Sequence, residues 1–323
     1  MNQSTALAPS PQPSFLGIEI GGTKLQAVVG SAQGAIHERR RLAVDRQLGG
    51  AGIRRTLESL LPQLLSSFRP AAVGVGFGGP VDGHSGRICC SHQIEGWSDF
   101  PLREWLHAHT QLPVGVENDA NTAALGEALC GAGQDANPVF YVTLGSGVGG
   151  GLVVNRRIYH GQLPGEAEIG HVRLDRQGTI VEHRCSGWAV DARIRRLVEG
   201  GSESPLARLA REQPGGEARH LGAALAVGDP VAQGVLHEVA DDLAFALSHV
   251  THLIHPERIG LGGGLALLGE PLRQAVNQAL PGFLMDAFLP GPSVRLSLLR
   301  EDAVPTGALL LAAEALSAQE RSS

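Results

Sequence analysis

The chain has 323 residues, more than the roughly 100–200 of one typical domain, so its length predicts two lobes with substantial cores. Hydrophobic residues make up 43% of the chain and 44 residues are glycine, which is typical of a globular protein with many tight turns. The formal net charge is −6, and the only short basic run, Arg39–Arg41, is interpreted as a solvated strand edge; a nucleic-acid partner is therefore not expected.

The first segment, residues 1–14, is rich in proline and serine and is interpreted as a disordered leader. The four cysteines have no C-x-x-C spacing and no secretory signal precedes them, which favours reduced thiols and a cytoplasmic protein. No apolar run reaches the roughly 18 residues that a membrane helix needs, so a membrane partner is not expected either.

Two stretches of the chain follow one plan of strand, glycine turn and return strand: FLGIEIGGTKLQAVVG (15–30) and VFYVTLGSGVGGGLVVNRRIYHG (139–161). In the first, Leu25, Ala27 and Val29 alternate with Lys24, Gln26 and Val28 along the return strand, which is typical of a β-strand. The similarity suggests a duplicated fold. Two unrelated hairpins remain the alternative, because glycine turns between strands are common.

Strands and helices alternate along the rest of the chain, which predicts an α/β architecture with mixed sheets. The segments are a helix at 54–68, a buried strand ending in a turn at 71–83, a short helix at 101–110, a helical stretch at 224–255 broken by Pro230, a strand, glycines and helix at 257–280, and a final helix at 306–316.

The glycine turns are candidate phosphate-binding sites. Without side chains in the way, backbone N–H groups can approach phosphate oxygens closely. The turns at 21–23 and 145–147 are each followed by a strand and lack the G-x-x-x-x-G-K-[ST] pattern, so neither is a P-loop. The third glycine segment, 262–264, leads into a helix and could serve close packing or nucleotide contact. Together the three predict a nucleotide held between the lobes.

Two polar stretches carry the other candidate groups. In VENDANTAALGEAL (116–129), the polar residues before the helix could cap it, or a carboxylate at this junction could accept a proton from a sugar hydroxyl during phosphoryl transfer. In GEAEIGHVRLDRQGTIVEHRC (165–185), acidic residues, histidines and a cysteine could bind a metal ion or a polar substrate. The residue types alone leave both questions open.

A family resemblance narrows these alternatives. LGIEIGGTK, GWSDFPLREWLHAHTQLPVGVENDANTAALGEA, VTLGSGVGGGLV, EAEIGHV and IGLGGGLA occur in this order, and over residues 15–316 the chain resembles the ROK family of sugar kinases and repressors in the actin-like ATPase superfamily. The resemblance implies a ribonuclease H-like α/β fold with sugar and ATP in a cleft between lobes. The expected lobes are 15–130, completed by a C-terminal helix at 306–318, and 131–305; a homodimer is also expected.

The resemblance implies a role for each matching residue. Asp119 would be the catalytic base that takes the proton of the attacking sugar hydroxyl, and Asn118, Glu168 and His171 would bind other hydroxyls. Mg²⁺ would bridge the ATP phosphates. The ATP-binding residues would be Gly21, Gly22, Thr23, Lys24, Gly145, Ser146, Gly147, Gly262, Gly263 and Gly264.

The largest departure from the family pattern concerns zinc. Most members carry C-x-C-G-x-x-G-C-x-E after E-I-G-H, and these cysteines join the histidine in a structural zinc site; here the matching stretch is RQGTIVEHRCSGWAV. Cys185 does not occupy a matching position, so no structural zinc is expected. Glu182 fits the family pattern E-x-x-x-S-G-x-A-[IV], which makes it a third sugar-binding carboxylate; a solvated surface pair with His183 is the alternative.

Two further departures affect substrate and metal. Glu19 stands where most members have an aspartate that reaches toward the metal through water, and Gln93 stands where a sugar-contacting asparagine is common. Both replacements keep the functional group on a longer arm. The implied function is an ATP-dependent hexose kinase acting on O6 of an aldohexose, with glucose favoured. The alternatives are a sugar-binding regulator without catalysis, for which residues 1–14 are too short to form a DNA-binding domain, or a kinase for fructose or an N-acetylated hexosamine.

Overall fold

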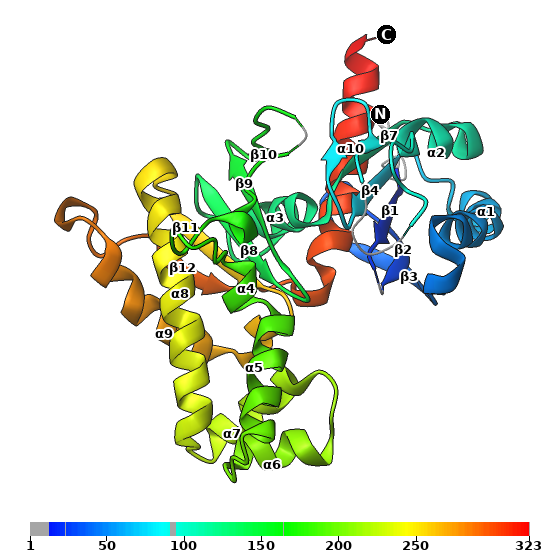
Figure 1. Ribbon diagram of the computed structural model, residues 1–323. Coiled ribbons are helices and arrows are strands. Elements are labelled where there is room, and N and C mark those ends of the chain that lie inside the picture. Colours follow the sequence, from blue (N-terminus) through cyan, green and yellow to red (C-terminus); the bar gives the residue numbers. More distant parts are fainter. Residues whose placement is uncertain (1–12, 23, 91–94, 164, 323) are drawn as a thin grey trace, which may run out of the picture.

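The computed structural model describes residues 13–22, 24–90, 95–163 and 165–322, which form two lobes joined side by side (Figure 1). Each lobe contains a five-stranded mixed sheet. The strand orders are β3-β2-β1-β4-β7 and β10-β9-β8-β11-β12, so an antiparallel three-stranded meander is followed by two parallel strands in both sheets. This shared topology supports the duplicated fold over two unrelated hairpins.

The strands have the following bounds. In the first lobe they are β1 (Phe15–Ile20), β2 (Leu25–Gly30), β3 (Ile36–Leu42), β4 (Val73–Phe77) and β7 (Val114–Asn118), with a small separate sheet of β5 (Val81–Asp82) and β6 (Arg87–Ile88). In the second lobe they are β8 (Val139–Leu144), β9 (Val148–Val154), β10 (Arg157–Ile158), β11 (Arg258–Gly262) and β12 (Ser293–Leu296).

The helices of the first lobe cover both faces of its sheet. They are α1 (Gly49–Phe68), α2 (Leu102–Thr110), α3 (Asp119–Cys130) and the C-terminal α10 (Ala303–Ser322). Residues of α1 and α2 pack with Leu25, Ala27 and Val29, whereas Val28 on the other side of β2 packs with Leu309 of α10. All residues of β2 are therefore buried, because the sheet is covered on both faces and β2 is an inner strand.

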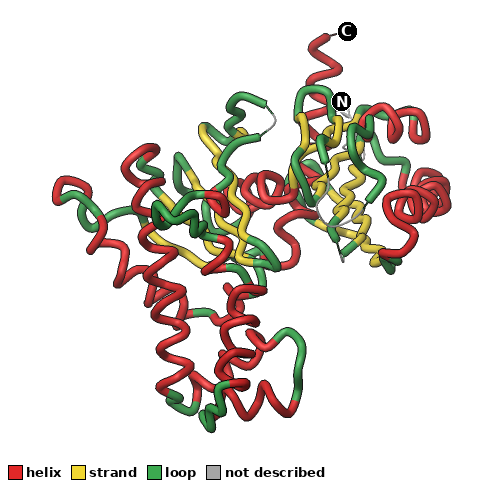
Figure 2. Tube along the Cα trace, in the orientation of Figure 1, coloured by secondary structure: helices red, strands yellow, loops and turns green. Residues whose placement is uncertain are grey.

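The second lobe carries a helical extension that points away from the first lobe (Figures 1 and 2). Asp229 caps the long helix α8 through its side chain, and this cap together with Pro230 produces the expected break in the 224–255 stretch. The helices of this lobe are α4 (Glu182–Cys185), α5 (Gly187–Glu199), α6 (Pro205–Glu212), α7 (Leu221–Ala226), α8 (Pro230–Ile254) and α9 (Glu270–Ala279).

Helix α3 lies between the two sheets and brings the lobes together. A Cβ at Gly307 of α10 would clash with the backbone of Thr122, so these two helices cross at van der Waals distance. On its other side, Ala124 of α3 approaches Gly151 of β9, where a Cβ would lie 2.6 Å from it. The N-terminus of α3, with Asn118 and Asp119, is thereby fixed at the junction of the lobes.

The expected elements agree with the structure apart from two points. Helix α1 begins at Gly49, five residues before the expected 54, where the N–H of Gly50 donates to the carbonyl of Glu95. The interpretation of Arg39–Arg41 as a solvated edge holds only in part. Strand β3 is an edge strand, but the guanidinium of Arg39 is largely buried and pairs with Asp302 at 2.5 Å. None of the described helices is long and apolar enough to cross a membrane.

Candidate active site

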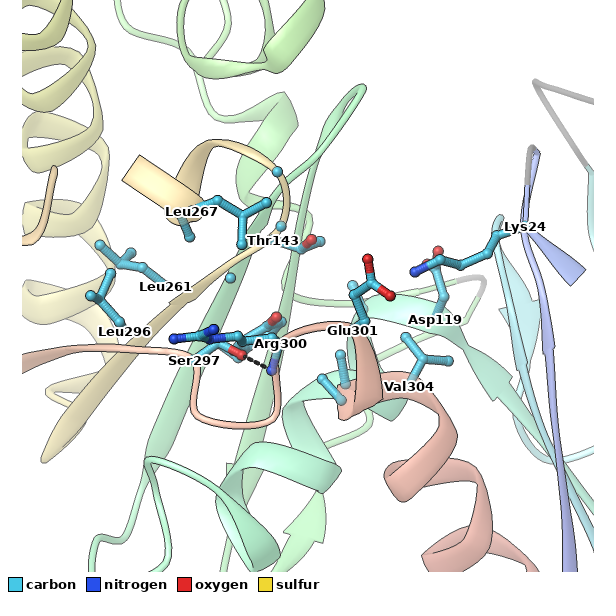
Figure 3. A pocket seen from close by; sticks show the side chains of 18 of the residues that line it. Lys24, Asp119, Thr143, Leu261, Leu267, Leu296, Ser297, Arg300, Glu301 and Val304 are labelled. Atoms are coloured by element: carbon cyan, nitrogen blue, oxygen red, sulfur yellow. Dashed lines mark hydrogen bonds between the residues drawn. The ribbon is translucent and has the colours of Figure 1, made fainter. Parts of the chain in front are cut away.

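A cavity of about 420 Å³ lies where the two lobes meet (Figure 3). One end is polar and carries Glu19, Lys24 and Asp119 from the first lobe and the N-terminus of α3. The other end is apolar and comes from the second lobe. Its residues are Leu261, Ala266, Leu267 and Leu296, with Gly262, Gly263, Gly264, Ser297, Arg300 and Glu301 at the margin. Such a cavity suits a ligand with a charged end and a flat apolar end.

Asn118 and Asp119 divide the two roles that the sequence left open. The side-chain oxygen of Asn118 accepts from the N–H groups of Ala120 at 2.8 Å and Asn121 at 3.2 Å, so Asn118 is the N-cap of α3. Its Nδ2 donates to the carbonyl of Gly79 at 3.0 Å. Helix capping therefore does not require the carboxylate of Asp119, which lines the cavity.

The environment of Asp119 suits a general base. Burial raises the pKa of this carboxyl to about 7, and the negative charges of Glu19 and, more weakly, Glu168 add to the shift. A carboxylate whose pKa lies near the working pH is partly ionised and binds a proton strongly enough to take it from a hydroxyl group. The charge of Glu168 thus reaches Asp119 from the second lobe, although Glu168 is not among the residues that line the cavity.

Glu19 is buried at the end of β1, where its Oε2 accepts from Nε2 of Gln26 at 2.5 Å. Oε1 of Gln26 in turn accepts from Arg39 at 2.9 Å, so the amide is held from both sides. Burial raises the pKa of Glu19, the usual result for a carboxyl that has lost solvent. Glu19 and Asp119 together present hard oxygen atoms to one cavity, which fits the chemistry of Mg²⁺.

The two glycine turns are closed by backbone hydrogen bonds. The N–H of Gly21 donates to the carbonyl of Lys24 at 2.7 Å, and the N–H of Gly145 donates to the carbonyl of Gly147 at 2.9 Å. Gly22 and Ser146 lie within these turns, and Thr23 lies outside the described residues. The Lys24 side chain extends toward Asp119 and Glu301 (Figure 3), where its ammonium can meet a phosphate group.

The third glycine segment is closely packed and also borders the cavity. A Cβ at Gly262 would clash with the hydroxyl of Tyr141, and Gly263 has φ of +82° and lies against the backbone of Leu144. Close packing therefore requires these glycines. The same segment borders the cavity, and α9 begins only after a 3₁₀ turn at Leu265–Leu268.

The predicted sugar-binding residues of the second lobe lie in two places. Glu168 and His171 are both exposed and flank a single 3₁₀ turn, in which the N–H of His171 donates to the carbonyl of Glu168 at 3.0 Å. Glu182 is half-buried, its Oε2 accepts from the N–H of Val148 at 2.9 Å, and it occupies the space that a side chain at Gly147 would need. Glu182 is thus not part of a solvated pair with the exposed His183.

Two further expectations concern Gln93 and Cys185. Gln93 lies outside the described residues. Cys185 is fully buried, with its Sγ 3.7 Å from the carbonyl oxygen of Val239, and burial raises the pKa of this thiol to about 12. A thiol in that state is a core side chain rather than a ready metal ligand.

The sequence analysis missed a cluster beside Asn118. Within the described part of the chain, Glu117, His160 and Glu166 form the one group of three acidic, histidine or cysteine side chains close enough to share a metal ion. Asn121 donates to both carboxylates. The available signals were the position of Glu117 at the start of the ENDAN motif and that of Glu166 two residues before Glu168.

A model of the ROK family matches residues 15–315 of this chain. The chain belongs to the ROK family. It is 32% identical over 306 residues to the glucokinase of Halalkalibacterium halodurans, covering 90% of this chain and 92% of the relative. It is 29% identical to the glucokinase of Thermotoga maritima, covering 92% and 96% of the two chains. The family resemblance stated from the motifs is therefore confirmed.

Solved structures confirm the expected fold. A ROK family glucokinase from Streptomyces griseus in complex with glucose and AMPPNP superposes with a TM-score of 0.81 at 28% identity, covering 93% of this chain and 99% of that one. A ROK hexokinase from Thermus thermophilus gives a TM-score of 0.74 at 27% identity, covering 96% and 100%. The two-lobed actin-like ATPase architecture is thus shared with known sugar kinases.

Proposed function

We propose that this protein is an ATP-dependent hexose kinase that transfers the γ-phosphoryl group of ATP to O6 of glucose. One observation carries the proposal: the carboxyl of Asp119, with a pKa of about 7, lies in the same interlobe cavity as Lys24 and the third glycine segment. A base beside a nucleotide-sized cavity is what phosphoryl transfer to a hydroxyl requires. The identity to two bacterial glucokinases supports glucose as the acceptor.

The proposed reaction transfers one proton and one phosphoryl group. Asp119 accepts the proton of the sugar hydroxyl while the sugar oxygen forms its bond to the γ-phosphorus, and the bond from that phosphorus to the bridging oxygen of ATP breaks to release ADP. The N–H groups of the turns around Gly21 and Gly145 would hold the phosphates, and Lys24 would offset their charge. The nucleoside would occupy the apolar end of the cavity, near Leu267.

Mg²⁺ is the cofactor we assign to the nucleotide. When bound, it neutralises charge that develops on the phosphate oxygens. Glu19 would hold the Mg²⁺ ion through water from the first lobe. Gln26 donates to one oxygen of this carboxylate, and the same hydrogen bond orients the other oxygen. No role for structural zinc is proposed.

The sugar would contact groups from both lobes. Nδ2 of Asn118 has a second hydrogen beyond the one donated to Gly79 and can donate it to a hydroxyl. Glu168 and His171 would approach from the second lobe. We keep Glu182 as a predicted sugar ligand through its second oxygen, and Gln93 as a predicted contact of the loop before Trp97.

A regulator without catalysis is the second candidate. A ROK family transcriptional regulator, a homologue of the E. coli MLC protein, superposes with a TM-score of 0.84, but at 22% identity this likeness concerns the fold alone. The raised pKa of Asp119 favours the kinase, because a residue that only accepts hydrogen bonds from sugar gains nothing from a pKa near neutrality.

The decisive experiment measures ADP release from ATP and Mg²⁺ with glucose, mannose, fructose, allose, N-acetylglucosamine and N-acetylmannosamine. We expect turnover on glucose, and a loss on the order of 10² to 10⁴ in kcat for Asp119→Asn with sugar binding retained. No turnover on any sugar, with a Tm that a sugar raises and that ATP and Mg²⁺ leave unchanged, would point to the regulator. Turnover with polyphosphate in place of ATP would change the proposed donor.

Assembly and location are proposed on family grounds only. We infer a homodimer in the cytoplasm, and sedimentation equilibrium of the purified chain is the direct test of the dimer. A monomer at micromolar concentration would contradict it.

A further inference from the structure

A histidine lies between two carboxylates that come from different parts of the chain. Glu117 belongs to β7 of the first lobe, whereas His160 and Glu166 follow β10 of the second. Nε2 of His160 is 3.5 Å from Oε2 of Glu117, and Nδ1 is 3.4 Å from Oε1 of Glu166. Each nitrogen of the imidazole therefore faces its own carboxylate.

Asn121 donates hydrogen bonds to both carboxylates. Its side chain is only 4% exposed, and its Nδ2 donates to Oε1 of Glu117 at 3.2 Å and to Oε1 of Glu166 at 2.6 Å. Oε1 of Glu117 also accepts from the N–H of Asn118 at 2.8 Å. The cluster is thus connected directly to the residue that caps α3 and precedes the proposed base.

The charge of the cluster favours a protonated imidazole. Both nitrogens of imidazolium are donors, whereas neutral imidazole would turn a lone pair toward one of the carboxylates. The carboxylate of Glu166, followed by the charges of Glu117 and Glu314, raises the pKa of His160 against the opposing effect of burial. The other titratable neighbour is His84, whose ring centre is 6.1 Å away.

A shared metal ion explains the arrangement less well. An ion bound by all three side chains would take one nitrogen of His160 and leave the other facing away from the acids. Here the two acids face opposite nitrogens of the ring. A protonated imidazole donates to both carboxylates at once, so the arrangement fits an ion pair better than a metal site.

We propose that His160 is a positioning residue for sugar binding, which ties the part of the second lobe that carries Glu168 and His171 to the end of β7. The inference rests on the proposed function, because that function places sugar-binding groups on both sides of this tie. Holding these groups in place before the sugar arrives reduces the ordering that binding would otherwise require. Loss of the tie should therefore weaken sugar binding far more than ATP binding.

The test compares His160→Gln with His84→Gln, a neighbouring histidine that does not lie between carboxylates. Glutamine is polar and of similar length, but it is neutral and carries both of its hydrogens on one nitrogen, so it cannot place a charged donor on each side as imidazolium does. We expect His160→Gln to raise the glucose Kd by ~10-fold, the loss of one charge-assisted hydrogen bond, and to leave the ATP Kd within ~2-fold. His84→Gln should leave both constants unchanged.

The pH dependence adds a readout that simple loss of packing would not produce. Because the pKa of His160 is raised, the protonated bridge is present at low pH and is lost as the pH rises through that pKa. The glucose Kd of the wild type should thus rise with pH, above the ordinary pKa of histidine, more steeply than that of His160→Gln. Asp119 titrates in the same window but is common to both proteins, so the difference between the proteins isolates His160.

Hydrogen exchange separates this inference from the proposed function. Without any ligand, amides of residues 165–171 should exchange faster in His160→Gln than in the wild type. Faster exchange in a protein that phosphorylates no sugar would support the tie and overturn the kinase. Equal exchange together with equal glucose affinity overturns the tie. Stabilisation by added Zn²⁺ that is absent from His160→Gln, with equal exchange in metal-free protein, overturns it in favour of a metal site.

Discussion

At the scale of single residues, Asp119 illustrates how burial turns a common side chain into a reactive one. Loss of solvent and the nearby charge of Glu19 both make ionisation of its carboxyl harder. The side chain of the adjacent Asn118 supplies the helix cap, whereas the carboxyl of Asp119 lines the cavity. The N-terminus of α3 determines where the carboxyl of Asp119 lies, and burial and nearby charges determine the pH at which it loses its proton.

The pH dependence of activity follows from this pKa. Asp119 must be ionised to accept a proton, and its pKa is about 7. We therefore expect kcat/KM for glucose to rise with pH through about 7 and to level off above it in His160→Gln, in which the pH-dependent tie is absent, since kcat/KM reports the free enzyme. Steady-state rates between about pH 5.5 and pH 8.5 measure this. A profile that is flat, or that falls across this range, would show that another group is the base.

Glu182 has two testable roles at this scale. If its main task is to bind sugar, Glu182→Gln should raise the KM for glucose, because a neutral amide replaces a charged acceptor. Its main task could instead be to support the second glycine turn by accepting from the N–H of Val148. In that case the amide oxygen of Glu182→Gln can still accept this hydrogen bond, and only Glu182→Ala should raise the KM for ATP. We expect the glucose KM to respond to both variants. An unchanged glucose KM in Glu182→Gln would remove this residue from the sugar site.

At the scale of elements, the crossing of α3 and α10 fixes the site. Neither helix tolerates a side chain at Gly126 or Gly307, where a Cβ would clash with the backbone of the partner helix. Close approach of two backbones holds the first turn of α3, and with it Asp119, in a defined position. Helix α10 comes from the far end of the chain, so the site is complete only when both ends of the sequence have folded together.

Gly307→Ala tests that crossing. The added methyl group must push the helices apart, and overpacking of this kind costs roughly 1–3 kcal/mol. Gly234→Ala is the matched control, because Gly234 lies in α8 with open space around it and alanine is the better helix former by roughly 0.5–1 kcal/mol. Denaturant unfolding should show the first variant to be less stable and the second to be equal or more stable. A neutral Gly307→Ala would mean that the crossing is looser than described.

At the scale of the whole molecule, a chain of polar contacts links Glu19 in the cavity to the segment that precedes α10. From Glu19 it runs through Gln26 to Arg39, whose guanidinium pairs with Asp302 beside the margin of the cavity. Three strands are crossed in this way. Arg41 and Glu301 form a second, exposed pair next to it. These contacts hold the edge of the first sheet against the segment that leads into α10.

A double-mutant cycle of Arg39→Ala and Asp302→Ala measures this contact. Asp302 is half exposed, so the coupling energy should stay within about 0.2–1 kcal/mol. Arg39→Ala should be the more destabilising single change, because it also removes a donor from the buried amide of Gln26. Urea unfolding of the four proteins gives both quantities. Equal losses for the two single variants would show that the link to Gln26 adds no stability.

The sequence by itself determined the fold class, the family and most elements of this protein. Alternating apolar residues and glycine turns depend on local chemistry, so they can be read without coordinates. The N-terminus of α3 was likewise visible in the ENDAN motif. The bounds of α1 were not, because its first turn depends on a contact with Glu95 far along the chain.

Only the tertiary structure decided which polar residues meet. The face of β2 that carries Val28 is buried because Leu309 of α10 packs against it, and the pattern of residues in the strand does not predict this contact with a helix at the far end of the chain. The cluster of Glu117, His160 and Glu166 likewise joins two lobes. A pKa depends on burial and on charges brought near by folding, so the sequence places the acid Asp119 at the N-terminus of α3, and only the fold shows that its pKa is raised to about 7.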